Sequence, residues 1–118
     1  MKRNIVLLLT ALMLTAALAF FLPACSSNAA SKLEPAVAAE TFLNSGNAFY
    51  NKADFDRAIM DYDQAILLNP QLAEAYNNRG YVYFVKGDMK AAIADFEAAL
   101  KLDPDYTSAK NNLERAKQ

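Results

Sequence analysis

A repeat of 34 residues constrains this chain more than any other feature of its sequence. When residues 73–106 are aligned with residues 39–72, twelve of the 34 positions hold the same residue. Repeats of this length do not bury their apolar face alone, so neighbouring units must stack on one another. The period therefore predicts a solenoid. The identical pairs are Ala39/Ala73, Glu40/Glu74, Asn44/Asn78, Gly46/Gly80, Lys52/Lys86, Asp54/Asp88, Ala58/Ala92, Ile59/Ile93, Asp61/Asp95, Ala65/Ala99, Leu68/Leu102 and Pro70/Pro104.

Each unit reads as two helices. Apolar and small residues recur three and four positions apart, which is the spacing of one helix face. In the second unit this pattern predicts helices near residues 73–86 and 89–102, and the first unit repeats the scheme. The expected fold class is therefore all-α.

Short polar signals mark the turn inside each unit. Gly87 suits a left-handed helix C-cap, and Asp88 after it suits a helix N-cap. In the first unit Ala53 stands at the position of Gly87. Because a left-handed residue with a Cβ atom is strained, we expect the first turn to be the less stable one. Pro70 and Pro104 end the units, since proline cannot continue a helix.

Seven positions carry the same pattern of aromatic, glycine, alanine and proline residues in both units: Phe42/Tyr76, Gly46/Gly80, Phe49/Tyr83, Ala58/Ala92, Tyr62/Phe96, Ala65/Ala99 and Pro70/Pro104. With this pattern the chain resembles the tetratricopeptide repeat (TPR). The resemblance implies an α-solenoid of two TPR helix pairs plus a C-terminal capping helix, with repeats at 39–72 and 73–106 and the cap at 107–118. Ala109 and Leu113 are expected to face the preceding helix. The usual leucine before the glycine is replaced by Ser45 and Arg79.

The resemblance also implies a partner-binding groove on the first helix of each repeat. Several aromatic and amide side chains are not needed for packing within a repeat, and they occupy the positions that line the concave face in this family. An alternative is that the rings are covered by residues 35–39 or are simply tolerated at the surface. The predicted groove residues are Leu43, Asn47, Tyr50, Asn77, Asn78, Tyr81 and Phe84.

One subtype of the family holds a partner's C-terminal carboxylate with three basic residues and two asparagines. Asn47 and Asn78 match the asparagines, but Leu43, Ser108 and Asn112 stand where the bases should be. We therefore expect no carboxylate clamp. Because no basic cluster lines the groove, the expected partner is an apolar or mixed segment of another protein.

The N-terminus resembles a bacterial lipoprotein signal. Lys2 and Arg3 precede an uncharged apolar run at 5–22, as in a secretory signal. Leu22, Ala24 and Cys25 fit a lipobox, and Pro23 departs from it. This predicts a signal peptide at 1–24 and an acylated Cys25, followed by a flexible tether at 25–38. An uncleaved membrane helix and a soluble secreted product are the alternatives.

The sequence contains few of the residue types that enzymes commonly use for catalysis. It contains no histidine and one cysteine, and its 13 acidic residues nearly balance its 12 basic ones. We expect no enzyme activity, no metal, no cofactor and no nucleic-acid partner. The acidic residues of the first unit are expected to be helix caps and solvated side chains, with Arg57 placed to pair with Asp61. These residues are Asp54, Asp56, Asp61 and Asp63.

Together these expectations describe a lipid-anchored protein on the periplasmic side of a bacterial cell envelope. Its expected function is that of a protein–protein interaction scaffold or assembly factor, acting through the concave groove. A self-associating structural lipoprotein and a peptide-handling accessory of a secretion system are the alternatives. A homo-oligomer is compatible with each of them.

Overall fold

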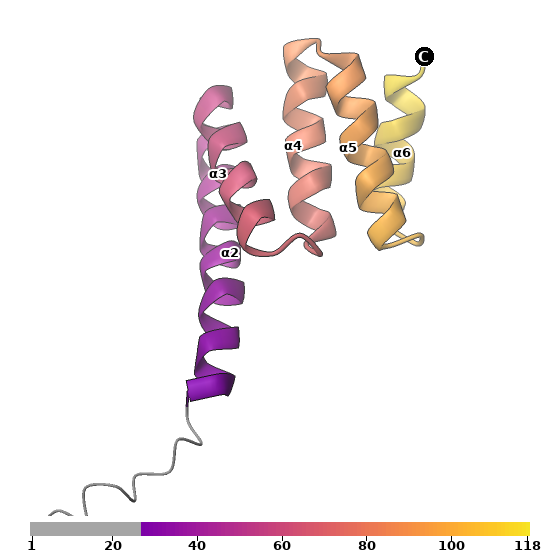
Figure 1. Cartoon of the computed structure of the whole chain (residues 1–118). Helices are drawn as coiled ribbons and strands as arrows, with labels where there is room; N and C mark the ends of the chain where they lie inside the picture. The colour runs from indigo at the N-terminus through magenta and orange to yellow at the C-terminus, as the bar shows by residue number, and fades with distance from the viewer. Residues whose placement is uncertain (1–26) are drawn as a thin grey trace, which may run out of the picture. The chain divides into compact units, whose positions relative to one another are not determined.

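The computed structural model describes residues 27–118, which form five α-helices (Figure 1). Consecutive helices are joined by short turns, and Lys32–Gln118 make one compact unit. The predicted all-α fold is confirmed. The helices are α2 (Ser27–Asn51), α3 (Phe55–Leu68), α4 (Ala73–Lys86), α5 (Met89–Leu102) and α6 (Thr107–Ala116).

Helix α2 differs from the expected first helix at its start. The first repeat was expected to begin at Ala39, whereas α2 begins at Ser27 and includes Pro35. From Ser27 onward, the segment expected to be a flexible tether therefore has helical backbone. The expected signal peptide at 1–24 and the acylated Cys25 lie outside the described residues. None of the helices among residues 27–118 is long and apolar enough to cross a lipid bilayer.

The turns form as the local sequence predicts. The carboxylates of Asp54 and Asp88 accept hydrogen bonds from the main-chain N–H groups of Arg57 (3.3 Å) and Ala91 (3.1 Å), so both cap a helix. Gly87 is left-handed, with φ 86°, and Ala53 is left-handed as well, with φ 58°. The expected strain at Ala53 is therefore present in the structure.

The two helices of each repeat approach closely at a glycine. A Cβ atom added to Gly46 would lie 2.6 Å from the ring of Tyr62, and one added to Gly80 would lie 2.9 Å from the ring of Phe96. Both rings are fully buried. Since real Cβ atoms do not come this close to a ring, glycine is needed at both positions for the helices to stay at this distance.

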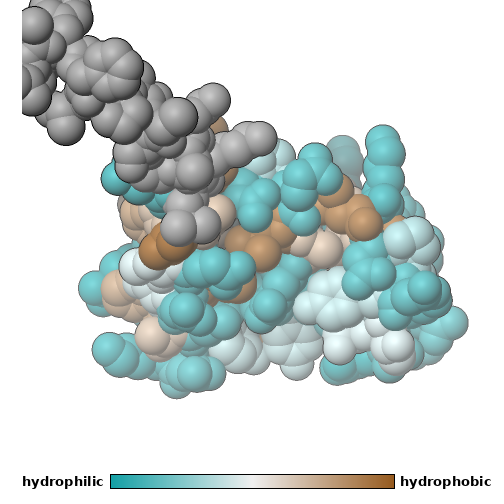
Figure 2. All heavy atoms as spheres, turned by 90° about the horizontal axis from the view of Figure 1, so that it is seen from below, coloured by the Kyte–Doolittle hydropathy of each residue, from teal (hydrophilic) through white to brown (hydrophobic). Residues whose placement is uncertain are grey.

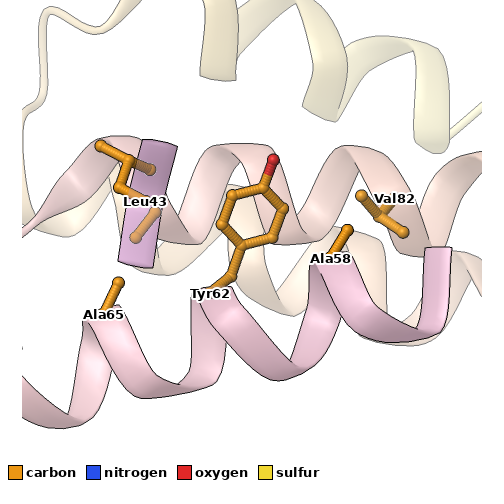
Figure 3. Packing of buried hydrophobic residues seen from close by; sticks show 6 residues of the cluster. Leu43, Ala58, Tyr62, Ala65 and Val82 are labelled. Carbon is orange, nitrogen blue, oxygen red and sulfur yellow. The ribbon is translucent and has the colours of Figure 1, made fainter. Parts of the chain in front are cut away.

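Alanines complete the packing around the buried rings. Figure 3 shows Ala58, Tyr62 and Ala65 projecting from one side of α3, with Leu43 near Ala65 and Val82 near Ala58. All five residues belong to one buried cluster. Val82 comes from α4, so this core joins the two repeats and not only the two helices of one repeat.

The C-terminal helix covers the second repeat as expected. Helix α6 packs on α5, where Ala109 is fully buried and Leu113 contacts the cluster around Phe96. Hydrophilic residues dominate the coloured surface in Figure 2, with apolar residues gathered in a strip among them. Some of the exposed apolar side chains belong to α3, where Met60 is 63% exposed.

The left-handed turns generate a stability prediction. Replacing Ala53 with glycine removes the steric cost of its Cβ atom, so we expect the Ala53→Gly variant to gain about 1 kcal/mol of unfolding free energy. Gly87→Ala is the matched opposite change and should lose a similar amount. Urea denaturation of both variants measures these effects, and an Ala53→Gly variant no more stable than wild type would contradict the prediction.

Candidate binding groove

A cavity of about 250 Å³ lies between the first helices of the two repeats. It contains five of the seven predicted groove residues, and also Asn51 and Tyr62. The predicted residues reach it because positions three and four apart share one face of a helix, in α2 and in α4 alike. Its full lining is Asn47, Tyr50, Asn51, Tyr62, Asn77, Asn78 and Tyr81.

Four asparagines form a continuous hydrogen-bonded row, which we call the amide chain. Asn112 Nδ2 of α6 donates to Asn77 Oδ1 (3.1 Å), and Asn77 Nδ2 donates to Asn78 Oδ1 (3.2 Å). Asn78 Nδ2 then donates to Asn47 Oδ1 of α2 (3.0 Å). All three bonds run in the same direction, so the amide dipoles reinforce one another. The amide chain therefore connects α6, α4 and α2 along one face.

Asn47 is the end of the amide chain. Its Oδ1 also accepts a hydrogen bond from the buried Tyr62 hydroxyl (2.7 Å), so the oxygen holds two donors. Its Nδ2 makes no hydrogen bond to any residue that the structure describes. An amide nitrogen carries two N–H donors. Asn47 therefore presents two fixed donors to a ligand in the cavity.

A strip of aromatic rings runs beside the amide chain. Tyr50 and Tyr81 meet edge to face across the two repeats, with ring centroids 5.9 Å apart. Tyr81 stacks on Phe84 at 6.1 Å, and Tyr50 lies 5.9 Å from Phe55. These four residues form the aromatic strip. Of these four, Tyr50 and Tyr81 line the cavity and are partly buried, so they offer ring surface there.

Two predicted groove residues lie elsewhere. Leu43 was expected to be exposed in the groove, but it is 2% exposed and packs in the core beside Ala65, so that expectation is wrong. Phe84 does not line the cavity. It packs toward the buried cluster around Phe96, and the guanidinium of Arg115 lies 5.2 Å above its ring.

The surroundings of the cavity disfavour negative charge. No residue in its lining is charged. Burial raises the pKa of Tyr62, and the nearby Tyr50, Glu74 and Asp61 raise it further. The carboxylates of Glu74 and Asp61 oppose the formation of another negative charge at the Tyr62 hydroxyl. An anionic ligand group would therefore enter a site that offers it no cation.

Asp54 and Asp56 of the first repeat act as expected, whereas Asp61 was expected to be solvated and its Oδ2 is instead shielded from solvent. Asp54 caps α3, and Asp56 pairs with Lys86. The expected pair between Arg57 and Asp61 is wrong, because Arg57 instead pairs with Asp54, which also caps the helix (2.5 Å). Within residues 27–118 no group of acidic side chains, histidine or cysteine could hold a metal ion.

Two features of the groove region were missed at the level of sequence. The hydrogen bond from Asn112 to Asn77 was not predicted. The 34-residue period could have indicated that Asn112 belongs to the groove, because Asn112 is the counterpart of the groove residue Asn78. Arg79 was noted only as a departure from leucine. It contacts carboxylates from two different helices, Asp63 of α3 and Asp95 of α5.

Comparison with known proteins identifies relatives of these helical repeats. The family model described as the tetratricopeptide repeat matches residues 43–107, which are 65 of the 118 residues. The second TPR domain of human RPAP3, solved in complex with the HSP70 peptide SGPTIEEVD, is 30% identical with a TM-score of 0.65. That alignment covers 68% of this chain and 67% of that chain. A search of curated proteins found no match.

Two other solved structures are similar. The TPR domain of Arabidopsis OM64 is 32% identical with a TM-score of 0.64, over 66% of this chain and 64% of that one. The TPR2B domain of yeast Sti1, in a complex with pHsp70, is 27% identical with a TM-score of 0.67, over 69% and 65%. The chain therefore spans about two-thirds of the length of these structures.

The Tyr62 hydroxyl generates a prediction about pH. Its pKa is raised in the folded protein, so above pH ~10 the unfolded chain loses the Tyr62 proton while the folded protein retains it. The stabilisation that the Tyr62 hydroxyl contributes is therefore fully present below pH ~10 and is lost as the pH rises above that value. We expect Tyr62→Phe to lose about 1 kcal/mol at neutral pH, because the hydrogen bond to Asn47 is removed.

Urea denaturation at pH 8 and pH 11 measures both effects. Wild type should lose more stability between the two pH values than the variant does, since the variant no longer has this titrating group. An equal loss in the two proteins would show that Tyr62 does not contribute to the alkaline destabilisation.

Proposed function

Because the chain belongs to the tetratricopeptide repeat family, we propose that it binds an extended segment of another protein in the cavity beside the amide chain. The observation that carries this proposal is the convergence of fixed amide donors and aromatic rings on one uncharged cavity. The similar human domain is in complex with an HSP70 peptide, and the similar yeast domain is in a complex with pHsp70. By this analogy the chain acts as an interaction scaffold or assembly factor.

The amide chain and the aromatic strip would hold different parts of the ligand. The two N–H groups of Asn47 suit a main-chain carbonyl oxygen, which is present at every residue of an extended segment. Tyr50 and Tyr81 offer ring faces to apolar side chains and hydroxyl groups for hydrogen bonds. Because Tyr62 and Asn78 already fix the Asn47 side chain, little entropy is lost when the ligand binds.

The ligand segment is expected to be apolar or mixed. The peptide bound to the human domain ends in Glu-Glu-Val-Asp and is acidic. In this chain Leu43, Ser108 and Asn112 stand where the carboxylate clamp has its bases, and Leu43 is buried besides. An acidic end would therefore lose its hydration without meeting a cation, which costs free energy. A neutral segment avoids this cost.

The location of the protein is part of the proposal. Lys2, Arg3 and the apolar run at 5–22 support export, and Cys25 after Ala24 supports acylation of the mature N-terminus. Under this proposal the solenoid is anchored by lipid on the periplasmic side of the cell envelope. Its partner is then a protein of the envelope.

Lipidation is tested directly at Cys25. The Cys25→Ser variant lacks the thiol that would carry the lipid, so we expect labelling by a palmitate analogue to disappear and the precursor to accumulate. Gel mobility and mass spectrometry of the envelope fraction measure both. Labelling retained in the variant would refute the lipid anchor and leave the groove proposal standing.

The groove is tested by photo-crosslinking in intact cells. A photoreactive residue at Asn51, which is exposed and lines the cavity, should capture the partner. The same residue at Met60, which is exposed but outside the cavity, is the matched control and should capture none. Once the captured segment is known, the Tyr81→Ala variant should bind it more weakly than wild type by ~2 kcal/mol or more, because an aromatic anchor is lost.

Two further measurements complete this test. Circular dichroism must show that Tyr81→Ala keeps its helical signal, and binding should weaken only modestly with added salt because no charge pair is involved. Equal capture from both photoreactive positions, or full affinity in folded Tyr81→Ala, would refute the groove. Capture of a second copy of this chain would support the self-associating alternative.

A further inference from the structure

The second repeat contains a charged contact that the first repeat only half reproduces. In the second repeat Arg79 donates through Nε and Nη2 to the carboxylate of Asp95 on α5, at 2.8 and 2.7 Å. Its Nη1 donates to Asp63 on α3, at 2.6 Å. The guanidinium therefore joins α3 and α5, the second helices of the two repeats. Planar two-point pairing with a carboxylate is its preferred geometry.

The first repeat keeps the carboxylate and lacks the cation. A shift of 34 residues places Asp61 at the position of Asp95 and Ser45 at the position of Arg79. Asp61 Oδ2 is shielded from solvent, yet no described residue donates a hydrogen bond to it. Arg57, one turn earlier, is engaged with Asp54. A shielded carboxylate oxygen without a donor is rare in folded proteins.

The 34-residue shift also relates one face of α2 to a buried face of α4. Ala75 and Val82 of α4 are fully buried in the core that includes α3. Their counterparts in α2 are Thr41 and Ala48, and both are exposed. The two faces differ because α3 packs on α4 and buries these positions there. The corresponding face of α2 is exposed at Thr41 and Ala48, and we call it the open face.

We propose that this open face binds a helix of a partner protein, and that an arginine of that helix pairs with Asp61. Arg79 shows within the same chain which side chain fits this position, because it fills the equivalent place in the second repeat. Lysine is a poorer candidate, since a single ammonium group cannot reproduce the two parallel hydrogen bonds. The way α3 packs on α4 shows how a helix fits beside the position.

A second copy of this chain fits the face less well. Each arginine of the described residues already has a partner within its own chain: Arg57 binds Asp54, Arg79 binds Asp95, and Arg115 lies over Phe84. A second copy would have to release one of these contacts. A partner protein with an unpaired arginine has no such cost.

The open face and the groove are separate sites. Ser45 and Asn47 are two positions apart in α2, and residues at that spacing point to nearly opposite sides of a helix. Asp61 does not line the groove cavity. Loss of one site should therefore leave the other intact, and the two proposals can fail independently.

The test uses a probe copied from the molecule itself. The probe is a fluorescent peptide of residues 54–69 carrying Asp63→Arg, because position 63 of α3 is the one that reaches the guanidinium site of the next repeat. A second peptide carries uncharged citrulline at the same position. We expect the arginine peptide to bind the full chain at least about tenfold more tightly than the citrulline peptide.

Three variants test whether Asp61 causes the difference in affinity between the two peptides. Asp61→Asn should make the two peptides bind equally, and Asp105→Asn, an exposed carboxylate elsewhere, should keep the difference. Ser45→Arg supplies the guanidinium from within the chain. It should raise the midpoint of thermal unfolding and block the arginine peptide, and the gain should vanish when Asp61→Asn is added.

Several results would overturn the proposal. These are equal affinity of the two peptides for wild type, no binding of either peptide, and a Ser45→Arg variant with an unchanged midpoint. Loss of arginine-peptide binding in Tyr81→Ala would assign it to the groove instead. A dimer in solution that Ser45→Arg dissociates would assign the face to a second copy of this chain.

Discussion

The close contact between a glycine and an aromatic ring sets the geometry of this protein. Gly46 against Tyr62, and Gly80 against Phe96, fix how near the two helices of each repeat lie. The contact also positions the groove, because Tyr62 is held where its hydroxyl reaches Asn47 Oδ1. A wider spacing would separate the hydroxyl from the amide and release Asn47. The packing of the repeat and the orientation of the Asn47 amide that lines the cavity thus depend on the same pair of residues.

Local features of the fold were predictable from sequence because their causes are local. Asp54 and Asp88 cap helices through a main-chain N–H three residues away, and Gly87 adopts the left-handed conformation that favours glycine. Burial was harder to predict where it depends on a neighbouring helix. Leu43 and its counterpart Asn77 are both buried, at 2% and 6% exposure. Helical periodicity within one repeat does not show which positions the next helix covers.

The candidate groove was predictable in composition but not in its connections. Five of its residues were identified because they are aromatic or amide side chains on the first helices that packing within a repeat does not require. The direction of the amide chain was not, since it depends on how α6 is placed against α4. Arg79 is similar: its sequence position shows only that a leucine is missing. Its two carboxylate partners lie on different helices, sixteen residues away on either side.

Comparing the two repeats separates packing from recognition. Positions that keep their residue, such as Ala58/Ala92 and Ala65/Ala99, are fully buried in both repeats, so they form the shared frame. Two pairs that change their chemistry, Asn47/Tyr81 and Ser45/Arg79, make different contacts in the two repeats. The pair Asn47/Tyr81 supplies an amide donor on one helix and a ring on the other, and both line the same cavity. The pair Ser45/Arg79 closes a charged contact in the second repeat and leaves it open in the first. Within a duplicated unit, these asymmetric positions are therefore where we propose that other molecules bind.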